Sequence, residues 1–246
     1  MTGAIIQARM GSTRLPGKVL REVCGKPLIL HQIERVRDSK SLDKVIVATS
    51  NAPENDAIER FCRKHDVAIF RGSEDDVLDR FYKCAKKERL DTIVRLTADC
   101  PLTDPLVIDE AVTLYKNGRY DYVANTVPPE SSTYPDGSDV EVFSIEALER
   151  ANRECDNPHY REHVTFFFWK YDNGFKTAQL QRDEDLSEIR FTVDYPEDLE
   201  VIEAILKKIK GKDIYGHVNE IAGVLKENPG IRDRNSKYKF GMGWKR

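Results

Sequence analysis

The sequence predicts a single α/β domain with a Rossmann-like, three-layer fold, in which a mainly parallel, mixed sheet lies between two layers of helices. Short apolar segments rich in β-branched residues alternate with amphipathic segments of helical period through the first half of the chain. The turns that join them are short, which is typical of strand–helix–strand units and of a parallel sheet. No repeat, low-complexity tract or clear linker divides residues 1–246, so we expect one domain that ends in a tail at about 228–246.

The first half of the chain supplies the regular part of this fold. Its expected strands are apolar runs at 4–7, 43–49, 67–70, 91–97 and 121–125. Its expected helices alternate with these strands. One begins at Pro27, and the others cover 53–64, 74–88 and 105–117. Pro27 suits the first turn of a helix, and Ser73 suits an N-cap. Because ligands bind at the carboxyl ends of the strands in such sheets, the loops that follow the strands should converge.

The second half is less regular. Residues 126–138 form a loop rich in turn-forming residues, after which the pattern predicts a strand at 139–143. The remaining predicted elements are helices at 144–154, 158–171 and 217–227, a helix that begins at Pro196, and strands at 176–180 and 189–193. From Asn228 onward the chain is polar and contains glycine, so we expect a surface-bound or loose tail.

Composition and charge exclude several classes of function. With a net charge of −3 and a pI near 6.0, the chain lacks the electrostatic footprint of a protein that binds nucleic acid or an anionic membrane. Its five cysteines include no C-x-x-C pair, which indicates reduced thiols rather than disulfides or a zinc site. Arg9 interrupts the first apolar run, and the run at 164–169 is too short to span a bilayer. We therefore expect a cytoplasmic protein.

The loop after the first strand carries the groups that a polyphosphate needs. Residues 8–18 read Ala-Arg-Met-Gly-Ser-Thr-Arg-Leu-Pro-Gly-Lys, so cations and hydroxyls stand beside glycines that let the backbone approach a ligand. The spacing fits neither a Walker A loop nor the G-x-G-x-x-G fingerprint, because Gly11 and Gly17 lie one residue too far apart for the first and Val19 is not a hydroxyl. An ordinary basic surface loop is the alternative interpretation.

The run from Ile6 to Lys18 resembles the signature loop of the CMP-KDO synthetase-like sugar cytidylyltransferases, which activate acidic sugars. Gln7, where the sugar-acid synthetases usually carry proline, points to the spore-coat polysaccharide (SpsF-like) branch. The segments 71–80, 134–141 and 161–165 resemble that branch too. The resemblance implies the nucleotide-diphospho-sugar transferase fold, CTP as a substrate and a homodimer. The residues that it places at the nucleotide are Ala8, Arg9, Gly11, Ser12, Arg14, Lys18, Arg71 and Gly72.

Asp99 and Asp194 each end a predicted strand and stand two residues before a proline. Proline favours extended backbone in the residue before it, so each carboxylate should be held at the sheet edge. Helix capping is the alternative role for either aspartate. Two such carboxylates in a chain with a polyphosphate-type loop favour Mg²⁺, which binds one or two carboxylates together with phosphates and waters. The resemblance agrees, since both residues match the two metal-binding aspartates of the family.

These features predict a magnesium-dependent nucleotidyltransferase that transfers CMP from CTP to a sugar acid or a sugar phosphate and releases pyrophosphate. Surface polysaccharide or glycan biosynthesis is the implied process. Catalysis should come from positioning and from charge stabilisation at the phosphate groups. The expected catalytic residues are Arg9, Lys18 and Asp99. For an acceptor carboxylate, the candidate cations are Arg161, His163 and Arg190, although the first two are equally consistent with surface residues.

Three other functions remain open from the sequence. A glycosyltransferase of related fold would use an Asp-x-Asp pair, and Asp139-Val140-Glu141 is the nearest match, although it lies far from the fourth strand. A GTP-specific sugar-phosphate guanylyltransferase also resembles this branch. The choice of base depends on backbone groups in the pocket, which the sequence does not reveal. A non-catalytic nucleotide-binding partner would be expected to lack the loop cations or the aspartates, and this chain has them all.

Overall fold

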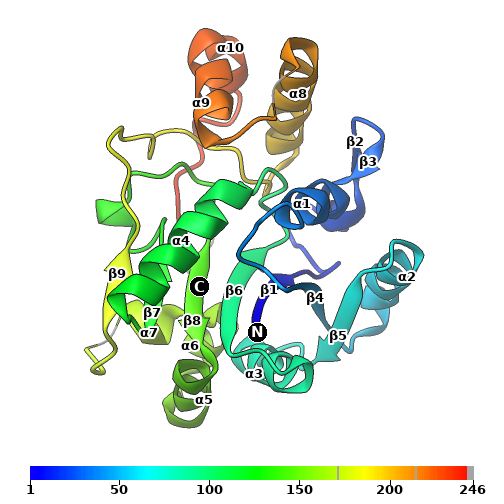
Figure 1. Ribbon diagram of the computed structural model, residues 1–246. Helices are drawn as coiled ribbons and strands as arrows, with labels where there is room; N and C mark the ends of the chain where they lie inside the picture. Colours follow the sequence, from blue (N-terminus) through cyan, green and yellow to red (C-terminus); the bar gives the residue numbers. More distant parts are fainter. Residues whose placement is uncertain (171, 214, 243–246) are drawn as a thin grey trace.

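A computed structural model describes residues 1–170, 172–213 and 215–242 of the chain. Its centre is a seven-stranded mixed sheet with the strand order β5-β4-β1-β6-β8-β7-β9 (Figure 1). The strands are β1 (Thr2–Gln7), β4 (Lys44–Ser50), β5 (Ala68–Gly72), β6 (Thr92–Thr97), β7 (Tyr122–Ala124), β8 (Glu141–Ser144) and β9 (Thr177–Gln179). Strand β8 pairs antiparallel with β6 and β7, and the other pairs in this sheet are parallel. The mainly parallel mixed sheet predicted from the sequence is confirmed.

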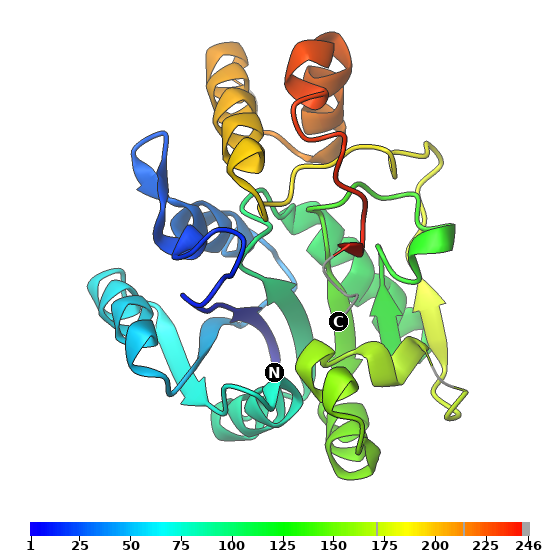
Figure 2. The ribbon, with the colours of Figure 1, turned by 180° about the vertical axis from the view of Figure 1, so that it is seen from behind.

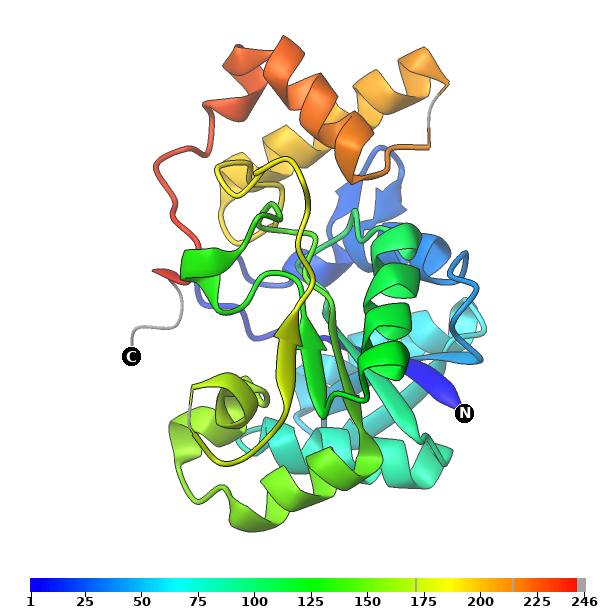
Figure 3. The ribbon, with the colours of Figure 1, turned by 60° about the vertical axis from the view of Figure 1, so that its left-hand side comes forward.

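Helices cover both faces of this sheet, as three layers require. One layer contains α1 (Leu28–Val36), α2 (Asp56–Lys64) and α4 (Pro105–Gly118). The other contains α3 (Val77–Glu88), α5 (Ile145–Glu154), α6 (Pro158–His163) and α7 (Phe166–Trp169). At one end of the molecule α8 (Pro196–Lys212) packs against α9 (Val218–Glu227), with α10 (Pro229–Arg232) beside them (Figures 1 and 3).

The alternation of side chains along the central strands explains why both faces need helices. In β1, Ala4 and Ile6 pack with the α1 and α4 layer, whereas Ile5 packs with the α3 and α5 layer. Successive residues of a strand point to opposite faces, so an apolar strand of this kind is buried only between two layers. All three side chains are completely buried.

The helix starts are fixed locally by polar side chains. Asp76 caps α3 by accepting the backbone N–H of Asp79, so the cap is Asp76 rather than the predicted Ser73, whose hydroxyl accepts the N–H of Asp76 instead. Asp104 caps α4, with Pro105 in the first turn.

A short hairpin of β2 (Glu22–Val23) and β3 (Lys26–Pro27), absent from the sequence prediction, leads into α1.

The predicted helix 158–171 is wrong as one element, because it is broken between α6 and α7. Val164 has φ 59° and ψ −60°, a conformation that cannot continue an α-helix. The break buries Val164 and Phe168 against the α3 and α5 layer, and tertiary packing therefore overrides helix propensity here. The last predicted residue of this helix, 171, lies outside the described residues.

The predicted strand 189–193 does not join the sheet. It is extended, but its backbone bonds go to loops: Phe191 N–H donates to the carbonyl of Asp136, and Val193 N–H donates to that of Asp99. A single bridge between Asp136 and Arg190 is the only ladder contact that the described residues show here. The segment is mostly buried, and its Arg190 and Thr192 line a cavity.

The tail is more ordered than the sequence predicts. Over the described residues 228–242 it begins with α10, and Asn235 is almost completely buried. Figure 2 shows this segment, in red, running from α10 back towards the middle of the sheet. Whether residues 1–246 form one domain stays a prediction. Among the described residues, no helix is both long enough and apolar enough to cross a membrane.

Candidate active site

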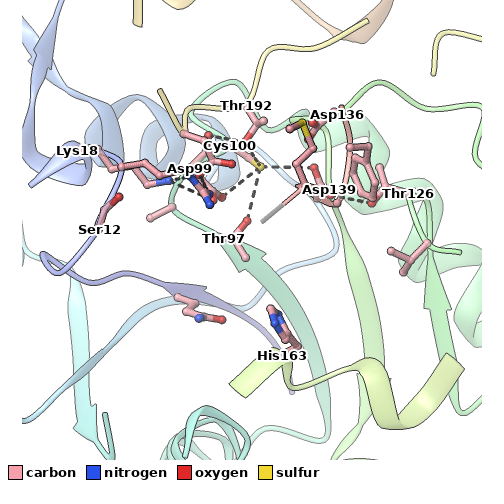
Figure 4. A pocket seen from close by; sticks show the side chains of 18 of the residues that line it. Ser12, Lys18, Thr97, Asp99, Cys100, Thr126, Asp136, Asp139, His163 and Thr192 are labelled. Atoms are coloured by element: carbon pink, nitrogen blue, oxygen red, sulfur yellow. Dashed lines mark hydrogen bonds and ion pairs between the residues drawn. The ribbon is translucent and has the colours of Figure 1, made fainter. Parts of the chain in front are cut away.

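A cavity of about 290 Å³ opens at the carboxyl ends of β1 and β6, where the parallel-sheet rule places ligands. Its walls come from the loop after β1, the loop after β6, the segments 126–141 and 190–195, the helices α6 and α7, and the tail. Figure 4 shows this space with Lys18 and Asp99 on one side, Asp136 and Asp139 on another, and His163 pointing in from α6.

The loop after β1 is folded by its own polar groups. The carbonyl of Met10 accepts the N–H groups of Ser12, at 2.9 Å, and Gly17, at 3.0 Å, which closes the loop. Gly17 has φ 69°, a left-handed conformation that favours glycine, and it starts the short 3₁₀ turn Lys18–Leu20. Leu15 is buried, so the loop is anchored to the core and Lys18 turns inward.

Lys18 joins the two aspartates that the sequence predicts as metal ligands. Its Nζ lies 2.9 Å from Asp194 Oδ1 and 3.4 Å from Asp99 Oδ2. The same ammonium donates to the carbonyl of Val193 at 2.6 Å, and Lys18 is only 9% exposed. Asp99, which follows β6, and Asp194, which follows the segment 189–193, therefore meet at one cation although they are far apart in sequence.

Asp194 is held by a second layer of polar contacts. Asp198, in the first turn of α8, accepts the backbone N–H groups of Asp194 and Tyr195 at 2.8 and 2.9 Å. Arg190 Nη2 lies 3.0 Å from Asp198 Oδ2 and 3.7 Å from Asp194 Oδ2. Because Asp198 is completely buried and fully engaged, it fixes the backbone from which the Asp194 side chain projects.

The charges around Lys18 shift the pKa values of this cluster in the directions that keep it ionised. Burial alone lowers the pKa of Lys18, but the carboxylates of Asp99 and Asp194 outweigh it and raise that pKa above its usual value. Burial raises the pKa of Asp194, yet Lys18 and Arg14, whose Nη2 is 2.7 Å away, bring it down to about 2. Asp194 is therefore a carboxylate at neutral pH.

Across the cavity lies a second acidic group formed by Asp136 and Asp139. Asp139 accepts the hydroxyl of Thr126 at 2.8 Å and the N–H of Gly137 at 2.9 Å. Asp136 is bonded to Arg190. Burial and the mutual repulsion of the two carboxylates raise the pKa of Asp136 well above its usual range, and burial chiefly raises that of Asp139. This part of the wall therefore resists the ionisation of its two carboxyl groups and presents their oxygens to hydrogen-bond partners.

Arg95 and His163 also line the cavity. Arg95, on β6, is bonded to Glu141 on β8, and Tyr122 donates its hydroxyl to the same carboxylate at 2.5 Å. His163 stacks on Phe166 with ring centroids 4.4 Å apart. Burial, followed by the neighbouring His159 and nearby cations, lowers the pKa of His163 to about 3. His163 is therefore a neutral imidazole at pH 7 and offers a hydrogen bond rather than a charge.

The structure brings together most of the residues predicted from the sequence. Those that line the cavity are Ala8, Arg9, Ser12, Arg14, Lys18, Asp99, His163, Arg190 and Asp194. The predicted residues that do not line it are Gly11, Arg71, Gly72 and Arg161.

Arg71 and Arg161 have other partners. Arg71 lies on the edge strand β5 and binds Asp56 and Glu59 of α2, at 2.6 and 2.7 Å. Arg161 binds Asp76, with Nη2 to Oδ2 at 2.8 Å, and carbonyls at the end of α5. Arg161 thus ties α6 to the cap of α3, so its position offers no support for the predicted contact with the acceptor.

Sequence reasoning missed the contribution of the tail. Tyr238, Lys239, Phe240 and Met242 line the cavity. Tyr238 stacks on Tyr195 with ring centroids 3.7 Å apart and planes 2° from parallel. Tyrosine and phenylalanine in an otherwise polar tail were the available signal, because isolated aromatic residues in a segment without periodicity commonly mark a docking contact.

The donor set of the Asp99 and Asp194 pair suits a hard divalent cation. Carboxylate oxygens of both residues face the same point, since one ammonium bonds to both. Oxygen ligands of this kind are what Mg²⁺ and Mn²⁺ prefer. The residues present therefore fit the metal that the sequence implies.

Comparisons with known proteins agree with this architecture. A model of the cytidylyltransferase family matches residues 3–222. The spore coat polysaccharide biosynthesis protein SpsF of Bacillus subtilis is 35% identical over 234 residues, which cover 92% of this chain and 94% of that protein. The 8-amino-3,8-dideoxy-manno-octulosonate cytidylyltransferase of Shewanella woodyi is 32% identical over 195 residues, covering 78% and 69%.

A solved structure of a cytidylyltransferase from Leptospira borgpetersenii superposes with a TM-score of 0.87 at 34% identity and covers 94% of this chain and 96% of that one. The sequence-based recognition of the family is confirmed by a match that runs through both the loop after β1 and the Asp99 and Asp194 strand ends. This chain is a nucleotidyltransferase and belongs to the cytidylyltransferase family.

Proposed function

We propose that this protein is a magnesium-dependent cytidylyltransferase that transfers CMP from CTP to a sugar acid or a sugar phosphate and releases pyrophosphate. The observation that carries the proposal is the meeting of Asp99, Asp194 and Lys18 at the mouth of a cationic loop. Acidic ligands for a metal and donors for a triphosphate are thereby placed at one end of the sheet, which is what in-line attack on a phosphate requires.

The loop after β1 is the proposed site of the triphosphate. Arg9 is exposed on the cavity wall and forms no ion pair with another described residue, so its guanidinium is available to phosphate oxygens. Arg14 and Lys18 already touch Asp194, and they can share their donors between that carboxylate and the phosphates. Ser12 lines the same wall and adds a hydroxyl donor.

Asp99 and Asp194 are the residues that would hold Mg²⁺. When bound, such an ion supplies Lewis-acid charge at a phosphate oxygen. The protein's own contribution is to fix the two carboxylates: Asp194 through Asp198, and Asp99 through its carbonyl, which accepts the N–H of Val193 at 2.8 Å. The Lys18 ammonium lies between them and offsets part of their charge.

The acceptor is proposed from the relatives. One relative is named as acting on 8-amino-3,8-dideoxy-manno-octulosonate, a sugar acid, and another is named for spore coat polysaccharide biosynthesis. A sugar acid would attack through a hydroxyl and a sugar phosphate through a phosphate oxygen. We propose that the product serves surface polysaccharide or glycan synthesis.

A pyrophosphate-release assay tests the proposal. The four nucleoside triphosphates are each combined with Mg²⁺ and a panel of two sugar acids (3-deoxy-manno-octulosonate and its 8-amino-3,8-dideoxy analogue) and two sugar 1-phosphates (glucose and mannose). We expect release with CTP, and loss of at least about 100-fold in Asp99→Asn, the size of effect seen when one charge-stabilising group is removed. Asp75→Asn, at an exposed position outside the cavity, is the matched control.

The other outcomes identify the rival functions. Near-normal turnover by Asp99→Asn would defeat the metal assignment. Release with GTP alone would identify a guanylyltransferase, and release of a free nucleoside diphosphate from a nucleotide sugar would identify a glycosyltransferase. Binding of a nucleoside triphosphate in equilibrium dialysis without turnover of any member of the panel would identify a non-catalytic nucleotide-binding partner.

Homodimer formation and a cytoplasmic location stay predictions. The apolar run 166–169, which a dimer could use as an interface if it were exposed, is largely internal. Phe166 and Phe168 are buried, and Phe167 and Trp169 pack against the core. Light scattering on the purified protein measures the oligomeric state directly. The cytoplasmic prediction is supported by five free thiols, four of them buried.

A further inference from the structure

The three cations predicted to bind an acidic acceptor are all unsuited to that role. Arg161 lies outside the cavity with Asp76 as its partner, and His163 is neutral. Arg190 lines the cavity but is bonded to Asp136 and to Asp198. A carboxylate or phosphate on the acceptor therefore needs another cation, because burying an anion beside the carboxyl groups of this wall without a cationic partner would be strongly unfavourable.

The cations that line the cavity differ in whether another described residue forms an ion pair with them. Lys18 and Arg14 are bonded to Asp194, and Arg95 is bonded to Glu141. Among the described residues, Arg9 and Lys239 are the cavity-lining cations that form no ion pair. Arg9 belongs to the loop that suits the triphosphate, whereas Lys239 comes from the tail.

The tail that carries Lys239 is a built wall of the cavity. Asn235 donates to the buried carboxylate of Asp198 at 2.8 Å, and Lys237 pairs with Glu197 at 2.7 Å. Tyr238 stacks on Tyr195, next to Asp194 in sequence, and donates its hydroxyl to Glu197 at 3.1 Å. The chain then turns, with the N–H of Met242 bonded to the carbonyl of Lys239.

These contacts attach the tail to the Asp194 segment and to the start of α8. Phe240 adds a contact to the core cluster that contains Val127, Phe143 and Phe168, in the half of the molecule built from β7 and β8. Figure 2 shows the loop after β1, in blue, and the end of the tail, in red, on different sides of the sheet's carboxyl edge. Lys239 therefore reaches the cavity on a segment of the chain separate from the proposed triphosphate loop.

We propose that Lys239 binds the anionic group of the acceptor, a sugar carboxylate or phosphate, and that the tail is part of the acceptor site. This inference rests on the proposed function. Asp136 and Asp139 offer carboxyl oxygens to sugar hydroxyls and no positive charge to an anion, so they favour an orientation in which the acceptor's charge lies towards Lys239 and its hydroxyls lie towards the two aspartates.

Steady-state kinetics with a matched pair of variants tests this assignment. Lys239→Ala is compared with Arg232→Ala, which removes the same charge from the tail at an exposed position outside the cavity, where its ion pair is with the neighbouring Asp233. We expect Lys239→Ala to raise the KM for the acceptor about tenfold or more, as for loss of a charge-assisted hydrogen bond, with the KM for CTP changed less than about twofold. Lys239→Arg should recover most of the affinity, and Arg232→Ala should behave as wild type.

The sugar-acid and sugar-phosphate arms of the panel show which anion Lys239 recognises, since only the correct class should show the KM effect. A rise in the KM for CTP in place of that for the acceptor would overturn the proposal and assign Lys239 to the triphosphate. Equal acceptor KM values in wild type and Lys239→Ala would overturn it as well. Both results leave CTP-dependent pyrophosphate release intact, so they are distinguishable from failure of the proposed function.

A binding measurement keeps the test independent of turnover. Inorganic phosphate is titrated into the CTP-saturated protein with Mg²⁺ present and followed by the ³¹P line width. We expect wild type and Arg232→Ala to bind phosphate and Lys239→Ala to bind it at least about fivefold more weakly, a smaller loss than for the complete acceptor. Equal binding by Lys239→Ala, or no binding by wild type, would contradict an anion subsite at Lys239.

Discussion

Lys18 and Asp194 lie 176 positions apart in the sequence, and their Nζ and Oδ1 atoms are 2.9 Å apart in the structure. This contact joins the loop after β1 to the segment that precedes α8. Because Asp99 shares the same ammonium, Lys18 is the point at which the proposed triphosphate loop and the proposed metal ligands meet. The properties of the site should therefore depend on this one side chain.

Lys18→Met tests that dependence. Methionine keeps the length of the side chain but removes its charge, and we expect kcat/KM for pyrophosphate release to fall about 10²–10³-fold, as for loss of a charge-stabilising donor. Lys26→Met, at an exposed ion pair with Glu34, is the control and should leave the rate unchanged. A loss below tenfold would show that Lys18 has only a structural role.

Asp198 should matter for stability because it is completely buried between charged and polar partners. Asp198→Ala leaves Arg190 and two backbone N–H groups without their acceptor, and we expect the free energy of unfolding to fall by about 3–5 kcal/mol. Urea denaturation measures the change, with Asp183→Ala at an exposed position as the control. A loss under about 1 kcal/mol would mean that water or a rearranged side chain replaces Asp198.

His163 should make the protein sensitive to acid. Its pKa in the folded state is lowered from 6.5 to about 3, so as pH falls below about 6.5 the unfolded chain takes up a proton that the folded protein refuses. Stability from this group is thus present above pH 6.5 and is lost progressively towards pH 3.

The variant His163→Gln should show a flatter fall in unfolding free energy between pH 6.5 and 4 than wild type, as measured by urea denaturation at a series of pH values. His65→Gln serves as the control and should keep the wild-type slope. Parallel slopes for wild type and His163→Gln would show that other groups cause the acid sensitivity.

The thiols should differ sharply in reactivity. Cys24 is exposed, whereas the other four cysteines are buried. Burial raises the pKa of Cys62 and of Cys84 to about 12, so these thiols remain protonated at pH 8. We expect Ellman's reagent to modify Cys24 alone in the native protein and all five after denaturation. Rapid native modification of a second thiol would indicate local opening, and Cys24→Ser identifies the fast group.

Local sequence patterns were sufficient to predict the mainly parallel sheet and to identify the two aspartates that line the cavity. Each of the first strands is a short apolar run between helical segments, and this alternation is typical of a parallel sheet. Asp99 and Asp194 were found because a proline two residues later holds each strand end extended. These signals are contained within a few neighbouring residues.

The same kind of signal failed where a distant partner decides the outcome. Arg161 and Arg190 are both arginines near the second half of the sheet, but only the structure shows that Asp76 engages one outside the cavity and that Asp136 and Asp198 engage the other within it. Likewise, the segment 189–193 has a strand pattern, yet loops provide its backbone partners.

The sequence by itself determined the fold class, the family and the loop and aspartates of the site, because periodicity, turn chemistry and a continuous motif are local properties of the chain. Tertiary structure alone decided which cations remain unpaired, that His163 is neutral, and that Lys239 of the tail lines the cavity. Charge and protonation depend on burial and on partners distant in the sequence, so they emerge only when the chain is folded.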